Sequence, residues 1–565
     1  MKKTIIAVGC VLAALILLLS VYFIFIKDKA APADNTDHVI TPTLAPSQTP
    51  TVGPTPTEAP GDTMDTKRLY PAYRMVKGEQ KYGYIDSSGT FVIEPSYDYA
   101  EPFSEGFAIV QVGSNYRVID PTGAVLFENN GTINSFHNGM ASFLNTKEDI
   151  WLYGYIDHTG KVIIEPSFLR ADDFNKEGQA YVSLPGEGLY QLIDRTGKVL
   201  ESYELKLGNS YPYDLKDGYV LFNDSETMKS GVKGVDGTTV LEAIYSEIVY
   251  LGHDLLAVKN PELDAYEAMF APYSIYNNSG EQLTDYTLFD VQPFIGEYAC
   301  AANATDVFFI DTKGQEVTSL PSFEGTGKLT LMDNIVRADI DGDLAYYRLD
   351  NTVLWKEDST TQLANGIKVK ERKFKPLRTV LVRYPEVEGL ADSAIQKAIN
   401  EQLETLFTES RANITVEEGL SVDDSFWTSL NKNLLTISMS GYDYYKGAAH
   451  GMPLREYYYI DITTGEFYDF EDLFIRGSDY KAMIDDFIKA KMEEANPEES
   501  MYFFDSFTGI TDAQHFYLNE KGIVIYFYPY EIAAYAAGFP EFEITFEELK
   551  EYIDTKGDFW KSFRE

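Results

Sequence analysis

A short phrase recurs along the first two-thirds of this 565-residue chain and constrains its fold more than any other feature. Residues 82–95 read YGYIDSSGTFVIEP, and residues 153–166 read YGYIDHTGKVIIEP. Each copy has an apolar stretch ending in Asp, a turn ending in Gly and a second apolar stretch. One such unit cannot bury its own apolar face, so it must stack on neighbouring units. This region therefore folds as a repeat array.

The Asp and Gly positions mark the period of the array. Asp caps a tight hairpin turn with its side chain, and Gly supplies the positive φ that the turn needs. We expect about three short strands in each unit, with Pro95 and Pro166 ending the pairing of the last strand. Successive markers lie roughly 40 residues apart, as in known repeat architectures. The clearest pairs are Asp86 and Gly89, Asp120 and Gly123, Asp157 and Gly160, and Asp194 and Gly197, with more degenerate copies at Asp236 and Gly237, at Asn277 and Gly280, at Asp311 and Gly314, and at Asp350, which lacks its glycine.

Some eight units of this size can close into a ring or stay open. A β-propeller leaves only short, protected sheet edges, whereas an open β-hairpin solenoid needs a cap at each end. The sequence has no such caps, so we predict an all-β, β-propeller-like array, with the β-hairpin solenoid as the alternative. The tyrosines of the repeats form either a sugar-stacking surface or, more simply, the packing between units.

The unit resembles the bacterial WG (or KWG) repeat family, whose core runs Trp-Gly-Tyr-Ile-Asp, then Gly, then Val-Ile-Pro. Tyr82 and Tyr153 stand where that family has its tryptophan. The resemblance covers roughly residues 70–355. It implies an architecture and says little about a ligand.

The chain begins with an uninterrupted apolar run from Ile5 to Ile26. This run is long enough to span a bilayer as a helix, and longer than the apolar region of a cleaved signal peptide. We therefore predict an uncleaved signal anchor over 1–29, with the bulk of the chain extracellular. Cys10 lies in a loose lipoprotein-like box, but the apolar run continues past it. Residues 30–66 are rich in Pro and Thr and predict an extended spacer.

The charge is strongly acidic, with 88 Asp and Glu against 47 Lys and Arg and a net charge of -41. Such a field repels nucleic acid and anionic membrane surfaces. It either attracts a cationic partner or simply solvates the surface. Cys300 is the one cysteine beyond the predicted anchor, so we expect it to fill a small apolar space.

The pattern changes after the predicted repeat domain, 67–357. Residues 390–407 have apolar residues at helical spacing, Ser478 is placed to cap another helix, and Thr545 with Glu548 forms a capping box. Apolar strands alternate with these helices, which predicts an α+β domain over 365–560. The predicted strands are 434–439, 456–461 and 523–527.

Several phrases of this domain resemble the extracellular domain of RsiV-type anti-sigma factors and the related module of PdaC-type peptidoglycan deacetylases. The RsiV-like resemblance implies a cationic, lysozyme-like protein as partner, and the PdaC-like resemblance implies peptidoglycan. One departure is Gly447-Ala448-Ala449-His450, where the family more often has a Gly-Gly pair before Ala-His. The matching segments are 444–451, 461–465, 470–474, 516–519, 522–527 and 529–532.

His450 is the main candidate for chemistry, because it lies in a loop of Gly and Ala that lets backbone approach closely. It could bind metal or act as acid or base with Asp443 or Asp461, or it could lock the loop by hydrogen bonds. No zinc-ligand spacing, nucleophile motif or phosphate loop occurs, so we predict no metal, no cofactor and no catalytic residue. The predicted binding residues are His450, Tyr444, Tyr445, Gly447 and Tyr530.

Residues 339–343 faintly resemble a calcium loop. A true calcium hand needs further oxygen ligands and a distal Glu. A hairpin turn at Asp341-Gly342 explains the segment more simply.

These features together predict a non-enzymatic, membrane-anchored protein of the bacterial cell envelope. It binds an extracellular ligand, either peptidoglycan or a lysozyme-like cationic protein, through the repeat platform and the C-terminal domain. The alternative is a cell-wall-modifying enzyme with its site around His450.

Overall fold

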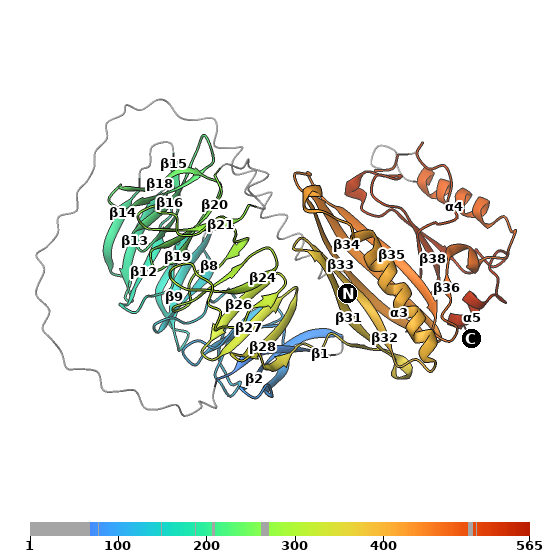
Figure 1. Cartoon of the computed structure of the whole chain (residues 1–565), viewed down its shortest axis with the longest axis horizontal. Coiled ribbons are helices and arrows are strands. Elements are labelled where there is room, and N and C mark those ends of the chain that lie inside the picture. Colours follow the sequence, from blue (N-terminus) through green and yellow to red (C-terminus); the bar gives the residue numbers. More distant parts are fainter. Residues whose placement is uncertain are drawn as a thin grey trace, which may run out of the picture. The chain divides into compact units, whose positions relative to one another are not determined.

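The computed structural model describes residues 68–564 except 77, 148–149, 187, 206–209, 262–270, 495–500 and 504 (Figure 1). These residues belong to one compact unit, Thr63–Glu565. The predicted signal anchor, 1–29, and the Pro/Thr-rich spacer, 30–66, lie outside the described residues. Within the described ranges, no helix has the length and apolarity needed to cross a membrane.

The repeat region consists of antiparallel sheets of three or four strands that follow one another along the chain. The predicted array of hairpin units is confirmed. Between Tyr70 and Lys356 the described residues form eight such sheets. In chain order they are β1 (Tyr70–Val76), β2 (Glu79–Ile85) and β3 (Phe91–Tyr97); β4 (Tyr99–Ala100), β5 (Ala108–Val112), β6 (Asn115–Ile119) and β7 (Val125–Asn129); β8 (Met140–Lys147), β9 (Ile150–Asp157) and β10 (Val162–Phe168); β11 (Arg170–Ala171), β12 (Gln179–Ser183), β13 (Leu189–Asp194) and β14 (Val199–Glu204); β15 (Ser210–Lys216), β16 (Tyr219–Asp224), β17 (Ser230–Gly234) and β18 (Thr239–Tyr245); β19 (Ile248–Gly252), β20 (Leu255–Lys259) and β21 (Tyr273–Asn277); β22 (Asp290–Val291), β23 (Ala299–Ala302), β24 (Asp306–Ile310) and β25 (Phe323–Glu324); and β26 (Gly327–Met332), β27 (Ile335–Ile340), β28 (Asp343–Arg348) and β29 (Val353–Lys356).

The predicted Asp turn joins the last two strands of a repeat. In the first sheet the Gly89 N–H donates to the Asp86 carbonyl at 3.0 Å, and the Asp86 carboxylate accepts from the N–H groups of Ser88 at 2.8 Å and Thr90 at 3.2 Å. The Ser88 hydroxyl also donates to this carboxylate and is the main cause of its lowered pKa. The same bonds recur at Asp120, Asp157 and Asp194.

Two degenerate copies keep this turn in a different register. The Gly237 N–H donates to the carbonyl of Gly234, so Gly234 occupies the place that Asp86 has in the first repeat. In the last repeat Arg348 takes that place, and Asn351 adopts the left-handed conformation of the missing glycine with φ 66°. Asn tolerates this conformation better than most residues. The prediction that Asp236 and Asp350 are the equivalents of Asp86 is therefore wrong.

The glycine of the Tyr-Gly-Tyr phrase is required by a neighbouring strand. A Cβ atom on Gly83 would lie 2.3 Å from the Ile93 carbonyl oxygen and 2.7 Å from the Pro95 nitrogen. Gly154 is equally close to its partner strand, where a Cβ would lie 2.5 Å from the carbonyl oxygen of Ile164. Pro95 lies inside β3, which continues to Tyr97 across a register shift, so the prediction that this proline ends the pairing is wrong.

Each sheet is buried on both faces. Tyr84 and Ile85 point to opposite faces of β2, and both are fully buried. The Tyr84 hydroxyl donates to the Glu101 carbonyl at 2.8 Å, and the equivalent Tyr155 hydroxyl donates to the Asp172 carbonyl at 2.6 Å. The tyrosines of the phrase thus serve packing between units.

Apolar clusters join each sheet to the next along the whole array. A further cluster joins the first sheet to the last, where Ile85 and Phe91 pack with Leu344 and Tyr346. Cys300 lies in the cluster between the last two sheets, as predicted for an apolar filler, and burial raises the pKa of its free thiol to about 11. The hairpin turn predicted at Asp341-Gly342 is also confirmed, between β27 and β28.

The C-terminal region begins with a sheet in the order β30 (Thr361–Gln362), β31 (Lys368–Leu377), β32 (Val380–Glu388), β33 (Leu420–Asn431), β34 (Leu434–Tyr445), β35 (Met452–Asp461) and β36 (Phe467–Tyr468). Only β32 and β33 pair in parallel in this sheet, and α3 (Ser393–Thr408) is the helical crossover that such a pair requires. Asp392 caps α3, which covers one face of the sheet with Ile399, Leu403 and Phe407 (Figure 1).

A second apolar core follows, built from β37 (Phe516–Leu518), β38 (Gly522–Tyr526), β39 (Glu541–Thr545), α4 (Tyr480–Glu494) and α5 (Asp558–Arg564). The helix α4 begins two residues after Ser478, whose buried hydroxyl has no hydrogen-bond partner in the described part of the chain, so the predicted Ser478 cap is wrong. Thr545 and Glu548 do form the predicted reciprocal bonds, but turns follow them instead of a helix. Short 3-10 helices are η1 (Ala364–Gly366), η2 (Glu409–Arg411), η3 (Val416–Glu418), η4 (Phe470–Leu473) and η5 (Tyr535–Ala537).

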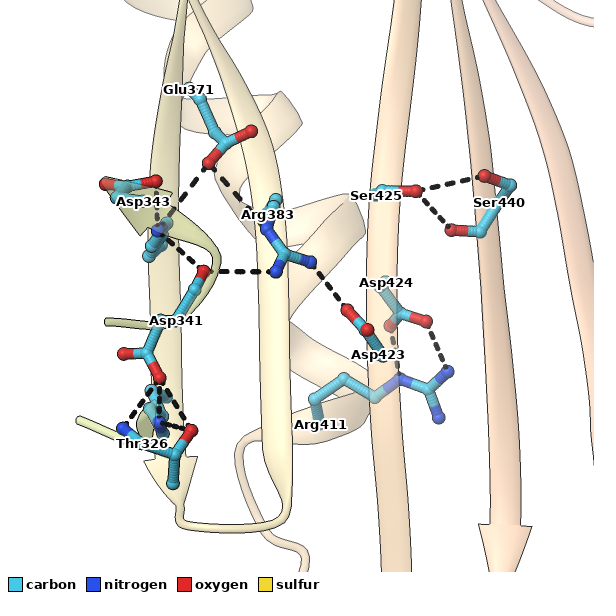
Figure 2. Close-up of polar contacts among 12 residues, drawn as sticks. Thr326, Asp341, Asp343, Glu371, Arg383, Arg411, Asp423, Asp424, Ser425 and Ser440 are labelled. Carbon is cyan, nitrogen blue, oxygen red and sulfur yellow. Dashed lines mark hydrogen bonds and ion pairs between the residues drawn. The ribbon is translucent and has the colours of Figure 1, made fainter. Parts of the chain in front are cut away.

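Polar contacts connect the β31–β32 hairpin to the turn between β27 and β28 (Figure 2). Lys373 and Arg383 donate to the Asp341 carbonyl at 2.9 Å and 3.1 Å. Lys375 pairs with the Asp341 carboxylate and donates to the Thr326 hydroxyl at 2.7 Å. Asp341 is thus a hairpin residue that also bonds basic side chains of the next sheet.

Candidate ligand-binding site

The predicted residue His450 lies in the loop between β34 and β35, next to a residue from a distant part of the chain. Its Nε2 is 3.1 Å from the hydroxyl of Tyr530, another predicted binding residue, although 80 positions separate the two. The imidazole also stacks on Tyr535, with ring centroids 3.8 Å apart and planes at 26°. The structure therefore brings two of the predicted residues together.

The backbone of Gly451 fixes this arrangement. Its N–H donates to the Tyr442 hydroxyl at 2.8 Å, and its carbonyl accepts from the Tyr535 hydroxyl at 2.8 Å. A Cβ atom on Gly451 would lie 2.5 Å from the Asp443 carbonyl oxygen and from the Tyr442 ring, so only glycine fits. We call Tyr442, His450, Tyr530 and Tyr535 the aromatic site.

The rings of the aromatic site are open to solvent on one side. Tyr442 is 43% exposed and Tyr530 is 52% exposed. Burial, followed by the nearby Tyr442 hydroxyl, raises the pKa of Tyr535 to about 12, so this hydroxyl stays protonated and keeps donating to Gly451. Tyr530 has φ 73°, a strained conformation for a bulky residue. The site therefore presents fixed rings at some cost in backbone strain.

The other predicted residues lie around the loop without joining the site. The Tyr444 hydroxyl donates to the Ala448 carbonyl at 3.1 Å and closes the loop, while Gly447 supplies a positive φ of 82°. Strand alternation places Tyr445 on the face of β34 opposite to Tyr442 and Tyr444. Tyr442 and Tyr535 were missed in the sequence. The only signal for Tyr442 is its position two residues before Tyr444 in the same strand.

The acids considered as partners of His450 are engaged elsewhere. Asp443 accepts two hydrogen bonds of 2.8 Å from Arg411, and Asp461 caps its own turn through the Thr463 N–H at 2.7 Å. Arg411 also donates to Asp424 at 3.0 Å. Asp424 is fully buried, and this burial raises its pKa to about 6 even though Arg411 acts in the opposite direction.

A second polar cluster follows the aromatic site along β35. The Glu456 carboxylate lies 3.3 Å from Nδ1 of His515 and accepts from the Tyr528 hydroxyl at 3.0 Å. The hydrogen bond that His515 donates to Glu456 is the main cause of the raised pKa of His515. Arg455 lies over the Phe539 ring, 4.1 Å from its centroid. Among the described residues, no group of three or more His, Cys, Asp and Glu is placed to hold a metal ion.

Residues 82–116 and 153–184 match the family described as WG containing repeat. Residues 471–547 match the protein family of unknown function DUF3298. The sequence has no significant match among curated proteins.

Solved structures with similar segments include two DUF3298 proteins. The one from Bacteroides fragilis is 17% identical, with 36% of this chain and 98% of that chain covered and a TM-score of 0.27. The one from Pseudomonas aeruginosa is 16% identical, with coverage of 35% and 94% and a TM-score of 0.25. Hsv2 of Kluyveromyces lactis is 11% identical, with coverage of 49% and 93% and a TM-score of 0.27. By its family matches, the chain carries WG-type repeats in its N-terminal region and a DUF3298 domain, of the RsiV and PdaC type, at its C-terminus.

Proposed function

We propose that this chain is a non-enzymatic binding protein of the bacterial cell envelope and that its ligand contacts the aromatic site. The observation that carries the proposal is the set of exposed rings at Tyr442 and Tyr530, held in place by the backbone of Gly451. Tyrosine rings offer a large apolar surface with a polar tip, and they are frequent anchors of recognition surfaces. Because the rings are already fixed, little conformational entropy is lost on binding.

Peptidoglycan is the first candidate ligand, because the rings can stack on sugars and the domain is of the PdaC type. A cationic, lysozyme-like protein is the second candidate. The net charge of -41 favours it, since an acidic surface attracts a basic partner and speeds the encounter. We place the anchor at 1–29 and the spacer at 30–66, so that the folded part lies outside the cell at a distance from the membrane.

We further propose that the WG-type repeats close into a ring of the β-propeller kind. In support, the apolar cluster between the first and last sheets has the same character as those between consecutive sheets. The Tyr346 hydroxyl of β28 donates to the Pro71 carbonyl of β1 at 2.8 Å. The close approach of Gly89 to the Leu354 carbonyl, 2.2 Å from a Cβ placed on the glycine, supports the same closure. The ring is then a platform that carries the DUF3298 domain.

The test uses the full chain in detergent, sedimented with purified peptidoglycan and, separately, titrated with lysozyme. Replacing Tyr530 with Ala should weaken binding to the true ligand roughly tenfold or more, as expected for an aromatic anchor. Tyr445→Ala is the matched control, because Tyr445 is 53% exposed on the opposite face of β34. The proposal is overturned if the chain neither sediments with peptidoglycan nor binds lysozyme. Release of cell-wall fragments by the wild type that is lost in His450→Ala, with binding intact, would favour an enzyme instead.

A further inference from the structure

The sheet that α3 covers on one side has an unusual composition on its other side. Ile437 of β34 lies in the core beneath α3, so alternation places its neighbour Ser438 on the opposite face. The pairing of β33 with β34 and of β34 with β35 continues without a register shift, so this alternation holds across three strands. We call this surface the serine face, and it consists of Ser425, Trp427, Ser429, Thr436, Ser438 and Ser440.

Two aromatic side chains lie on either side of a serine in one row of this surface. Trp427 pairs with Ser438, and Ser438 pairs with Tyr457 of β35. Two strand spacings separate the outer residues, which is roughly 10 Å. Tyr457 is half-buried and stacks on Tyr517, with ring centroids 5.2 Å apart, so Trp427 is the open ring of this row.

Trp427 contributes little to the packing of the domain. It is 73% exposed, whereas the residues on the other face of the same strand, such as Val422, are buried. A large aromatic residue kept in solvent on an otherwise polar sheet is typical of a recognition surface. Packing within the fold therefore does not explain why a tryptophan occupies position 427.

The hydroxyl groups of the serine face are available to a ligand. Ser425 and Ser440 lie 3.1 Å apart and bond each other (Figure 2). Ser429, Thr436 and Ser438 have no side-chain hydrogen-bond partner among the residues that the structure describes. Each hydroxyl can both donate and accept.

The serine face is also electrically neutral in a chain with a net charge of -41. The charged residues at its borders are paired internally, Asp423 with Arg383 at 2.5 Å and Arg455 with Glu541 at 2.6 Å. A cationic partner would find no unpaired acid on this surface, so charge complementarity favours an uncharged ligand.

The serine face is continuous with the aromatic site. Asp423 pairs with Tyr442 across β33 and β34, so Tyr442 lies on the same face as Ser438 and four residues along the strand. That separation is roughly 13 Å. An extended ligand on the row of Trp427 can therefore reach the aromatic site.

We propose that the serine face binds a neutral polysaccharide strand, with Trp427 stacking on a sugar ring and the serine hydroxyls bonding the sugar hydroxyls. The strand runs along β34 towards Tyr442. This inference rests on the proposed function and names the part of the ligand that is recognised, the uncharged glycan backbone.

The test titrates the full chain in detergent with chitohexaose, an uncharged β-linked N-acetylglucosamine oligosaccharide, by calorimetry. Trp427→Ala should weaken binding roughly tenfold or more, and Ser438→Asp should weaken it by placing a charge beside Trp427. Trp151→Ala is the matched control, because Trp151 is also a strongly exposed tryptophan, 60%, but lies in the repeats. Thermal unfolding of each variant checks that the fold is kept.

The outcomes separate this inference from the proposed function when sedimentation with peptidoglycan is measured in parallel. The proposal that the serine face binds glycan is refuted if the wild type and Trp427→Ala bind chitohexaose equally well. It is also refuted if the wild type has no affinity for chitohexaose but still sediments with peptidoglycan. The proposed function survives both results. If the wild type binds neither chitohexaose nor peptidoglycan, the serine face is overturned, and the proposed function falls with it if lysozyme is not bound either. If Trp427→Ala loses affinity only for lysozyme, the face recognises a protein and the glycan assignment is wrong.

Discussion

The hydroxyl of Tyr346 donates a hydrogen bond of 2.8 Å to the carbonyl of Pro71, a residue 275 positions earlier in the chain. The bond joins β28 of the last repeat sheet to β1 of the first, beside the apolar cluster that these sheets share. Tyr346 is fully buried, so its hydroxyl cannot exchange this partner for water. The first and last repeat sheets are thus joined by this hydrogen bond as well as by apolar packing.

Replacing Tyr346 with Phe should lower the free energy of unfolding by about 1 kcal/mol, because it removes one buried hydrogen bond and leaves the Pro71 carbonyl unpaired. Chemical denaturation of the full chain in detergent measures this loss. Tyr347→Phe is the control, since its half-buried ring packs against the cluster between the last two sheets and its hydroxyl has no hydrogen-bond partner in the described residues. Equal stability of the two variants would contradict a role for the bond.

Gly83→Ala should be more damaging than substitution of a turn glycine. The added Cβ would meet backbone atoms of β3 at 2.3 Å and 2.7 Å, which no side-chain rotation relieves. We expect a loss of about 3 kcal/mol or more, at the upper end for overpacking. Gly237 has φ 86°, but the space around a Cβ placed on it is open. Gly237→Ala should therefore lower the free energy of unfolding only by the backbone strain, about 1 kcal/mol. The denaturant midpoints of both variants measure these losses of stability. A larger loss of stability for Gly237→Ala than for Gly83→Ala would refute the steric explanation.

Asp424 should make the fold less stable as the pH rises. Burial raises its pKa from 3.8 to about 6, so the folded chain binds this proton more tightly than the unfolded chain does. By linkage, its contribution to the free energy of unfolding falls between pH 3.8 and about 6, by on the order of 3 kcal/mol in total. Asp424→Asn should remove this slope in a series of denaturation curves.

The control for this experiment is Asp443→Asn. Asp443 is held by Arg411 in two bonds of 2.8 Å, so its loss should destabilise the fold at neutral pH, where Asp424→Asn should be neutral or stabilising. If Asp424→Asn instead lowers stability by the same amount at every pH, the buried carboxyl is not the origin of the slope.

His515 should titrate above its usual range. The hydrogen bond to Glu456 raises the pKa of His515 from 6.5, which means that the fold favours the charged ring. This stabilisation is complete below pH 6.5 and is lost as the pH rises through the folded pKa. Histidine ring signals in NMR give the midpoint, and Glu456→Gln should lower it while the remaining histidines serve as internal controls. An unchanged midpoint in that variant would exclude Glu456 as the cause.

Sequence reasoning succeeded where the physics is local and periodic. The hairpin at Asp341-Gly342 was predicted because a two-residue turn needs residues that accept positive φ, and both do so here. The helix predicted within 390–407 exists as α3 because its apolar spacing matches one buried face, formed by Ile399, Leu403 and Phe407. Such features depend on neighbours within a few residues.

The failures concern relationships that residue types alone do not encode. Asp236 and Asp350 have the expected side chain, but the register of the turn depends on which carbonyl accepts the closing bond, and that carbonyl belongs to Gly234 or Arg348. Ser478 was a reasonable cap, yet helix starts shift by one or two residues with the packing of the first turn.

The aromatic site was only half predicted for a similar reason. Tyr535 reaches His450 because the segment after β38 returns to the end of β34, a long-range contact with no periodic signal. Tyr442 was hidden in a strand whose tyrosines all look alike in sequence. Only the pairing register distinguishes the face that meets His450 from the one that does not.

The hairpin turns of the repeats have a consequence for how such a chain can diverge. Each turn closes with bonds among its own few residues, and Gly234 and Asn351 fill places that aspartate and glycine hold in other copies. Where a turn touches no other sheet, as at Gly237, a change in that turn can be compensated within it. Copies can drift apart in sequence while their shape is retained, so the number of recognisable repeats understates the number of folded ones.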